Sequence, residues 1–187
     1  ERVPLSVEEI QQLPVPDFSL LRYAKISLYP VSWIRGCCMN CEFCTVKGNV
    51  RCPPADYPLT QIVTLYERFG ATTFFIVDDL FGQKRDATLE FCKKIAAWQK
   101  RLHVKFHFTV QIRLDKAGDG ELLRAMRNAG IQVLAIGFES PIAEELKAMN
   151  KCLRPEEMIR NTKLFHRAGF LVHGMFIFGY PAMPGVN

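Results

Sequence analysis

The sequence predicts an α/β fold, a partial parallel β/α barrel of five strands with helices on its outer face. Two observations support this prediction. Apolar runs of strand length alternate with helical patterns along the chain, and 187 residues are too few for a complete eight-stranded barrel, which needs roughly 250. Strand-helix-strand order implies right-handed crossovers and hence parallel strands. An open doubly wound sheet remains the alternative.

The expected strands share β-branched and aromatic residues over short stretches. They cover residues 26–34, 72–77, 104–110, 131–138 and 170–178. The expected helices share apolar residues three or four positions apart, together with a capping or stop signal. One helix ends at Gly70, one has Asp86 as its cap, one runs from near Asp119 to Gly130, a short one opens at Ser140, and the last runs from Pro155 to Gly169.

Before the first strand, residues 1–25 are expected to form an N-terminal helix and an arm. Ser6 followed by Glu9 has the spacing of a capping box, and the segment from Pro14 to Asp17 is broken by proline. The remaining residues, 26–187, are expected to form one core domain that is truncated at its C-terminus.

Composition excludes several classes of protein. With 49% hydrophobic and 23% charged residues, the chain can bury one core. Its net charge of +5 is spread along the sequence, which favours anionic ligands or an acidic redox partner over a dedicated nucleic-acid interface. The most apolar stretch, residues 170–183, is too short and too interrupted to span a membrane, and the charged first residues do not form a secretory signal. A cytoplasmic location is expected.

The chemistry is concentrated after the first strand, in residues 35–44. Of the seven cysteines, four lie within eight residues there, which in a reducing compartment favours metal binding over disulfides. Cys37, Cys41 and Cys44, at spacings of three and two intervening residues, can converge on one iron-sulfur cluster, because soft thiolates suit iron. One iron then lacks a protein ligand and is open to a chelating small molecule. Gly36 permits a close turn, and Phe43 can pack beside the flat base of such a ligand.

This cysteine pattern resembles the signature of the radical S-adenosylmethionine (SAM) superfamily, Cys-x3-Cys-x-aromatic-Cys. Residues 75–81 resemble the end of the second strand in its cobalamin-binding and methylthiotransferase-related groups. The resemblance implies a 4Fe-4S cluster, SAM bound to its open iron, and electron transfer that yields methionine and a 5'-deoxyadenosyl radical. It also implies six barrel strands, of which this chain supplies five, and a one-electron donor such as flavodoxin or ferredoxin. Cobalamin would require a domain that residues 1–25 cannot form.

Polar residues at the ends of the later strands extend the resemblance. By analogy with the family, these positions contact the amino, carboxylate, ribose and adenine parts of SAM, at the strand ends where parallel β/α folds build their sites. The candidates are Asp78, Asp79, Gln111, Arg113, Glu139, Ser140, Ile177 and Gly179, with Phe43 from the cysteine loop.

Other interpretations of these residues stay open. Cys38, Cys41, Cys44 and Cys52 could form a ferredoxin-like electron-transfer module or a structural zinc site. Asp78 and Asp79 could cap a turn. Ser140 is expected to cap a helix whatever the role of Glu139. Glu139 and Arg113 could be ordinary surface or loop charges, and Cys92 fits a helix-face core position. Methylation, methylthiolation and rearrangement of an unidentified substrate all remain possible reactions.

Overall fold

The computed structural model describes residues 4–46 and 48–180, so the predicted end of the core domain at residue 187 lies outside the described residues. Five parallel strands form one sheet in the order β1-β2-β3-β4-β5. They are β1 (Tyr29–Val31), β2 (Thr73–Ile76), β3 (His107–Gln111), β4 (Ile131–Glu139) and β5 (Leu171–Phe176). This order has no reversal, so the chain winds in one direction, as in a barrel. The partial barrel is confirmed, and the doubly wound sheet, which needs a switch point, is wrong.

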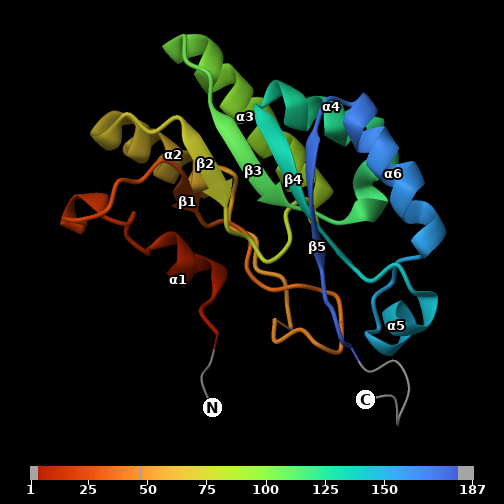
Figure 1. The fold of residues 1–187 in the computed structure, drawn as a ribbon. Helices are drawn as coiled ribbons and strands as arrows, with labels where there is room; N and C mark the ends of the chain where they lie inside the picture. Colours follow the sequence, from red (N-terminus) through yellow and green to blue (C-terminus); the bar gives the residue numbers. More distant parts are fainter. Residues whose placement is uncertain (1–3, 47, 181–187) are drawn as a thin grey trace.

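Helices connect the strands and cover one face of the sheet (Figure 1). They are α1 (Val7–Gln11), α2 (Asp56–Phe69), α3 (Arg85–Leu102), α4 (Gly120–Asn128), α5 (Ala143–Ala148) and α6 (Pro155–Arg167), with short 3-10 helices η1 (Phe18–Leu20) and η2 (Leu114–Gly118). Figure 1 shows all the strands running toward the end of the molecule where the loop after β1 and helix α5 lie. A parallel sheet therefore brings its carboxyl ends to that end of the molecule.

The main core lies between the sheet and the helices. Phe74 of β2 and Phe108 of β3 are buried and stacked, with ring centroids 5.4 Å apart, and Phe91 of α3 meets the Phe108 ring edge-on at 6.3 Å. Alternate residues of these strands, such as Phe75 and Thr109, point to the opposite face and are only half-buried. That opposite face corresponds to the inside of a barrel.

Several start signals seen in the sequence are confirmed. Ser6 and Glu9 form a complete capping box on α1, and the Asp119 side chain accepts from the Leu122 amide at the start of α4. Pro155 occupies the first turn of α6. These helices begin where their local sequences favour it. The capping side chains accept from backbone amides of the first turn that would otherwise have no partner, and proline has no such amide.

Two other capping predictions are wrong. Asp86 does not cap α3: the N-cap is Lys84, and Asp86 lies in the first turn with its side chain fully exposed. Ser140 is not the N-cap of α5, which is Ile142. The Ser140 hydroxyl instead accepts from the Ile142 amide at 3.0 Å and bonds to the Glu145 carboxylate, so it shapes the turn before the helix.

The first strand is much shorter than the predicted span of residues 26–34. Only Tyr29 to Val31 pair with β2. Beyond them, the amides of Trp33 and Ile34 donate to the Asp78 carboxylate rather than to a neighbouring strand. Trp33 and Ile34 are buried, so the apolar run in the sequence extends past the end of the strand. Their backbone has already left the sheet.

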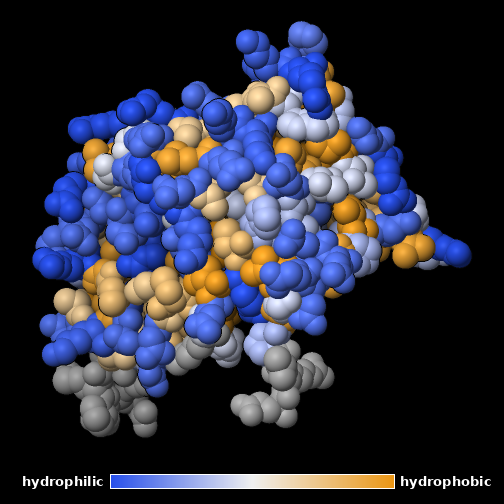
Figure 2. All heavy atoms as spheres, turned by 180° about the vertical axis from the view of Figure 1, so that it is seen from behind, coloured by the Kyte–Doolittle hydropathy of each residue, from blue (hydrophilic) through white to orange (hydrophobic). Residues whose placement is uncertain are grey.

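Figure 2 shows the side of the molecule opposite to that in Figure 1, where hydrophilic side chains predominate and hydrophobic ones form separate patches. Across the residues that the structure describes, no helix is long and apolar enough to cross a membrane.

Strand β5 lies at one edge of the sheet and presents apolar side chains to solvent, with Leu171 67% exposed. Unpaired backbone groups on such an edge are a template for association. We therefore expect the isolated chain to self-associate, and Leu171→Lys to reduce this association as measured by sedimentation at increasing protein concentration. Leu20→Lys, which alters an exposed leucine of η1 away from the sheet edge, is the control. A wild-type chain that stays monomeric throughout would contradict the expectation.

Candidate functional site

The cysteine loop, residues 36–50, connects β1 to the segment before α2. Its two ends are joined by an isolated antiparallel bridge, in which the amides of Arg35 and Arg51 each donate to the carbonyl of the other at 3.0 and 2.8 Å. Gly36 opens the loop with φ +86°, and a Cβ there would collide with the Asn49 carbonyl. The close turn predicted for this glycine is therefore present.

The end of β2 holds the start of this loop. Asp78 Oδ1 accepts from the Trp33 and Ile34 amides at 2.7 and 2.9 Å, and Asp79 Oδ2 accepts from the Gly36 amide at 2.6 Å. The Gln83 side chain donates from Nε2 to the Gly36 carbonyl at 2.9 Å. Consecutive aspartates thus anchor the backbone that leads into the cysteines. Capping of a turn, the simpler interpretation of this pair, does not account for these contacts.

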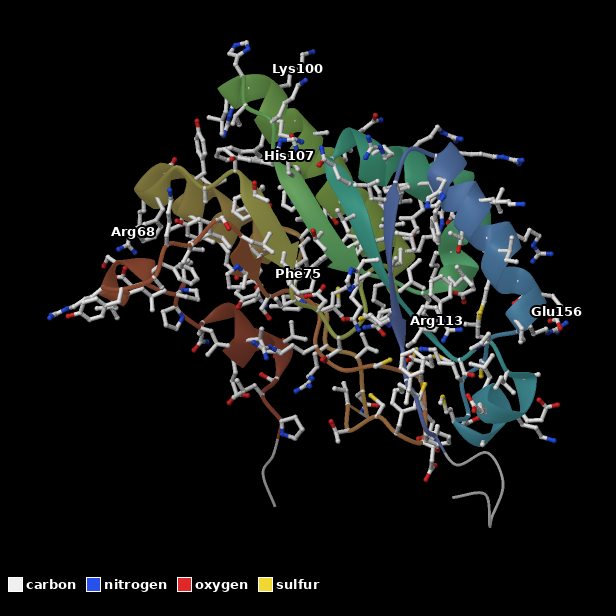
Figure 3. The ribbon with its side chains drawn as sticks, in the orientation of Figure 1. Arg68, Phe75, Lys100, His107, Arg113 and Glu156 are labelled. Carbon is white, nitrogen blue, oxygen red and sulfur yellow. The ribbon has the colours of Figure 1, made fainter. Side chains whose placement is uncertain are left out.

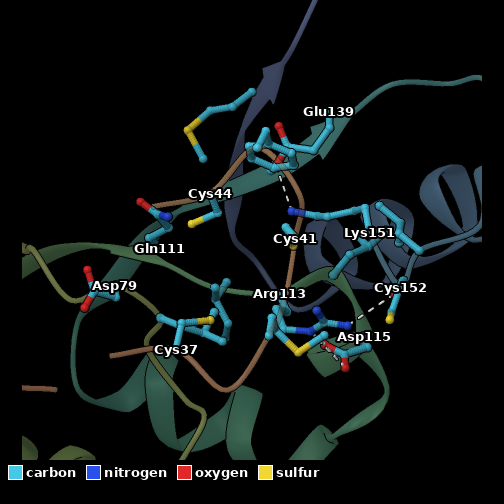
Figure 4. Close-up of a pocket in the computed structure, with 18 residues that line it drawn as sticks. Cys37, Cys41, Cys44, Asp79, Gln111, Arg113, Asp115, Glu139, Lys151 and Cys152 are labelled. Atoms are coloured by element: carbon cyan, nitrogen blue, oxygen red, sulfur yellow. Dashed lines mark hydrogen bonds and ion pairs between the residues drawn. The ribbon is translucent and has the colours of Figure 1, made fainter. Parts of the chain in front are cut away.

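Four of the cysteines line one pocket at the carboxyl ends of the strands (Figure 4). They are Cys152 and the three that the sequence pattern selects, Cys37, Cys41 and Cys44. Burial raises the pKa of the Cys41 thiol, the Lys151 charge lowers it, and the neighbouring Cys44 and Cys37 raise it further. Cys37, Cys44 and Lys151 line the same pocket as Cys41, so their charges act on its thiol.

The other cysteines of the alternative register lie elsewhere. Cys38 is exposed, and neither Cys38 nor Cys52 lines this pocket. The pKa of the Cys52 thiol is raised mainly by burial and in smaller part by the nearby Asp78 carboxylate. Within the described part of the chain, no three His, Cys, Asp or Glu side chains converge closely enough for a single metal ion.

Four of the polar candidates from the strand ends line the same pocket. Asp79, Gln111, Arg113 and Glu139 follow or end β2, β3 and β4, and Phe43 joins them from the cysteine loop. Glu139 is strained, with φ +64°, and its side chain is 10% exposed. Arg113 pairs with Asp115 at 3.2 Å and also donates to the Cys152 carbonyl at 3.2 Å. Figure 3 shows Arg113 on the side of the sheet where α5 lies.

Four other candidates are not brought to the pocket. Asp78 is 3% exposed beneath the loop, and Ser140 is 1% exposed and occupied in the turn before α5. Ile177 follows β5 and donates its amide to the Glu139 carbonyl at 2.8 Å, while a Cβ added at Gly179, where φ is +74°, would meet no atom of the described residues within 4 Å. None of the four is among the residues that line the pocket, and their contacts with SAM stay predictions.

The sequence reasoning missed Lys151, which lies three residues after Ala148, the last residue of α5. Its Nζ lies 2.7 Å from Glu139 Oε1 and 5.9 Å from the centre of the Phe43 ring, and its side chain is 17% exposed. It therefore contacts both a candidate ligand-binding carboxylate and the cysteine loop. No local pattern marks this lysine, because its position depends on the turn that ends α5.

The fold and the pocket define a class: an enzyme domain built as a partial β/α barrel, with its site where the strands end. The sequence profile of the Radical SAM superfamily matches residues 31–187. The chain belongs to this superfamily.

Among curated proteins, the chain is 30% identical over 142 residues to the hopanoid C-2 methylase of Rhodopseudomonas palustris (strain TIE-1), an alignment that covers 74% of this chain and 27% of that protein. The chain thus spans about a quarter of the length of this relative.

Solved structures show the same fold. The radical SAM methyltransferase TsrM from Kitasatospora setae superimposes with a TM-score of 0.71 at 16% identity, covering 83% of this chain and 31% of TsrM. The cobalamin-dependent SAM radical enzyme OxsB superimposes with a TM-score of 0.67 at 21% identity, covering 79% of this chain and 23% of OxsB.

Proposed function

We propose that this domain holds a 4Fe-4S cluster on Cys37, Cys41 and Cys44 and binds SAM beside it for reductive cleavage. The observation that carries the proposal is the placement of these three thiols, with Asp79, Gln111, Arg113 and Glu139, around a single pocket. When bound, the cluster supplies the electron that splits the SAM sulfonium into methionine and a 5'-deoxyadenosyl radical. Three thiolate ligands leave one iron for the amino and carboxylate groups of SAM.

The pocket side chains match the groups of SAM. Arg113 and Lys151 offer cationic donors for the carboxylate, and Asp79 and Glu139 offer acceptors for the amino group and the ribose hydroxyls. Phe43, 39% exposed at the pocket, offers an aromatic surface to the adenine. The Glu139–Lys151 pair holds both side chains in place before SAM arrives, which reduces the entropy lost on binding.

For the reaction class, we propose methylation of a substrate carbon, with methylthiolation as the related alternative. The support is the likeness to a protein named as a methylase. Cobalamin would act in this reaction only through a domain other than the one described. We propose flavodoxin or ferredoxin as the electron donor, consistent with the net charge of +5, and a reducing cytoplasmic compartment, consistent with the free cysteines.

One observation favours an iron-sulfur electron carrier as the second candidate. Cys152 also lines the pocket and could supply a fourth thiolate, which would close the cluster to SAM. In the view of Figure 4, Cys152 lies apart from the other three thiols, on the far side of Arg113.

The test is anaerobic reconstitution with iron and sulfide, followed by dithionite and SAM. The proposal requires both iron and sulfide on the chain and 5'-deoxyadenosine among the products, detected by mass spectrometry. A stable cluster that produces no 5'-deoxyadenosine would favour the electron carrier. Bound zinc without sulfide would overturn both candidates.

Glu139→Gln should weaken SAM binding by about tenfold or more, because it removes one charge-assisted hydrogen bond and leaves Lys151 without its ion pair. Calorimetric titration of SAM into the reconstituted protein measures this, and iron content should stay the same. Asp79→Ala should also weaken SAM binding, and it additionally removes the hydrogen bond that Asp79 accepts from the Gly36 amide. Glu144→Gln, on the exposed start of α5, is the control. Equal SAM affinity in the Glu139, Asp79 and control variants would remove both residues from the SAM site.

A further inference from the structure

The end of helix α5 is closed by a hydrogen-bonded turn of the Schellman type. The Asn150 amide donates to the Lys147 carbonyl at 3.0 Å, and the Lys151 amide donates to the Leu146 carbonyl at 2.9 Å. Asn150 has φ +50° at the position where this motif calls for a left-handed residue. Glycine adopts that conformation with the least strain, so the conformation alone does not explain an asparagine here.

The Asn150 side chain provides a reason for the asparagine. Its Nδ2 donates to the Asn40 carbonyl at 2.7 Å, across 110 positions of sequence. Beside it, the Met149 carbonyl, which α5 leaves without a partner inside the helix, accepts from the Glu42 amide at 2.8 Å. The residues on both sides of Cys41 are therefore bonded to the end of α5.

Cys41 itself is 8% exposed, whereas its neighbour in sequence Cys38 is exposed. The end of α5 thus holds the middle of the cysteine loop, while Asp78, Asp79 and Gln83 hold its start. The same α5 turn continues into Lys151, which pairs with Glu139 in the pocket wall.

We propose that Asn150 is a positioning residue for the cluster loop: its side-chain amide fixes Asn40 and so directs the Cys41 thiol into the pocket. The inference rests on the proposed role of Cys41 as a cluster ligand. A residue present only to end the helix would lose nothing on change to glycine. A positioning residue would lose its hold on the loop even though the helix end is preserved.

Two variants separate these roles. Asn150→Gly keeps the left-handed turn and removes the donor, and Asn150→Asp keeps the size of the side chain but presents an acceptor to the Asn40 carbonyl. His103→Gly is the matched control, since His103 ends α3 with φ +52° and has no contact with the cysteine loop among the hydrogen bonds of the described residues.

The first readout needs no cluster. The cluster-free full chain is treated with iodoacetamide, and the modification rate of each cysteine is followed by mass spectrometry, with Cys38 as the reactive reference and buried Cys92 as the protected one. Both Asn150 variants should raise the Cys41 rate relative to Cys38 by about threefold to tenfold, the range expected for loss of one hydrogen bond. His103→Gly should leave the ratio at its wild-type value.

The second readout uses the reconstituted protein, in which both Asn150 variants should release iron to a chelator faster than wild type does. Failure of the wild type to take up a cluster would overturn the proposed function, whereas the alkylation result would still decide the role of Asn150 in positioning the loop. Unchanged Cys41 alkylation in folded Asn150→Gly would overturn the inference. So would global unfolding of Asn150→Gly, since Asn150 would then support the fold in general.

Discussion

Changing Cys37, Cys41 or Cys44 to alanine is expected to remove most of the bound iron and abolish 5'-deoxyadenosine formation. Each thiolate would hold a different iron, and two thiolates cannot retain the cluster against loss to solvent. Each variant is reconstituted anaerobically, and its iron and sulfide contents are measured beside wild type. Cys38→Ala is the matched control, because Cys38 is exposed and does not line the pocket.

The same series tests the other ligand sets. Loss of the cluster in Cys38→Ala or Cys52→Ala, with retention in Cys37→Ala, would contradict the proposal and favour the ferredoxin or zinc register. Loss in Cys152→Ala would instead identify a fourth ligand and favour the electron carrier. A change in the spectrum of the reduced cluster on adding SAM is expected only if one iron has no protein ligand.

The second large effect is expected from Asp78. Burial raises the pKa of this carboxyl from 3.8 to about 7, against the lowering effect of the Trp33 and Ile34 amides, while Asp79 raises it and Arg35 lowers it. Because the folded-state pKa is raised, the folded protein holds the proton more tightly than the unfolded chain does. The stability that this provides is fully present below pH 4 and is lost as the pH rises from about 4 through about 7.

Asp78→Asn removes this titration. The stability of the variant relative to wild type should therefore rise between pH 4 and pH 8 by about 4 kcal/mol, the equivalent of a shift of roughly three pKa units. Urea unfolding of both proteins across that range measures the difference. Asp86→Asn changes an aspartate that is fully exposed on α3 and should show no such trend. Parallel stability curves for wild type and Asp78→Asn would mean that Asp78 titrates normally.

The sheet could be predicted from sequence because buried parallel strands are continuous apolar runs, and the helices between them show their own spacing. The length of β1 could not. Trp33 and Ile34 are as apolar and buried as strand residues. Their amides, however, donate to the Asp78 carboxylate, which is distant in sequence, and not to a neighbouring strand. Sequence also does not show which of two adjacent aspartates faces inward: Asp78 is buried beneath the loop, while Asp79 lines the pocket.

The site was predicted in part for a related reason. Spacing selects Cys37, Cys41 and Cys44 because ligands that share a loop are local in sequence, and all three line the pocket. Glu139 and Arg113 are found by their position at strand ends. Lys151 and Asn150 were not found, since each acts across the fold from the end of α5, on Glu139 and Asn40 respectively. Contacts of this kind require knowledge of which loops meet at the carboxyl edge of the sheet.

The contacts that anchor the cysteine loop have a consequence for how its sequence can vary. Asp78, Asp79, Gln83, Met149 and Asn150 all bond to main-chain atoms of the loop or of the residues leading into it. Main-chain groups are the same for almost every residue type, so the path of the loop does not depend on which side chains stand between the thiols. Replacement of Met39, Asn40 or Glu42 should therefore leave the path of the loop unchanged, whereas at Gly36 a side chain would collide with the Asn49 carbonyl.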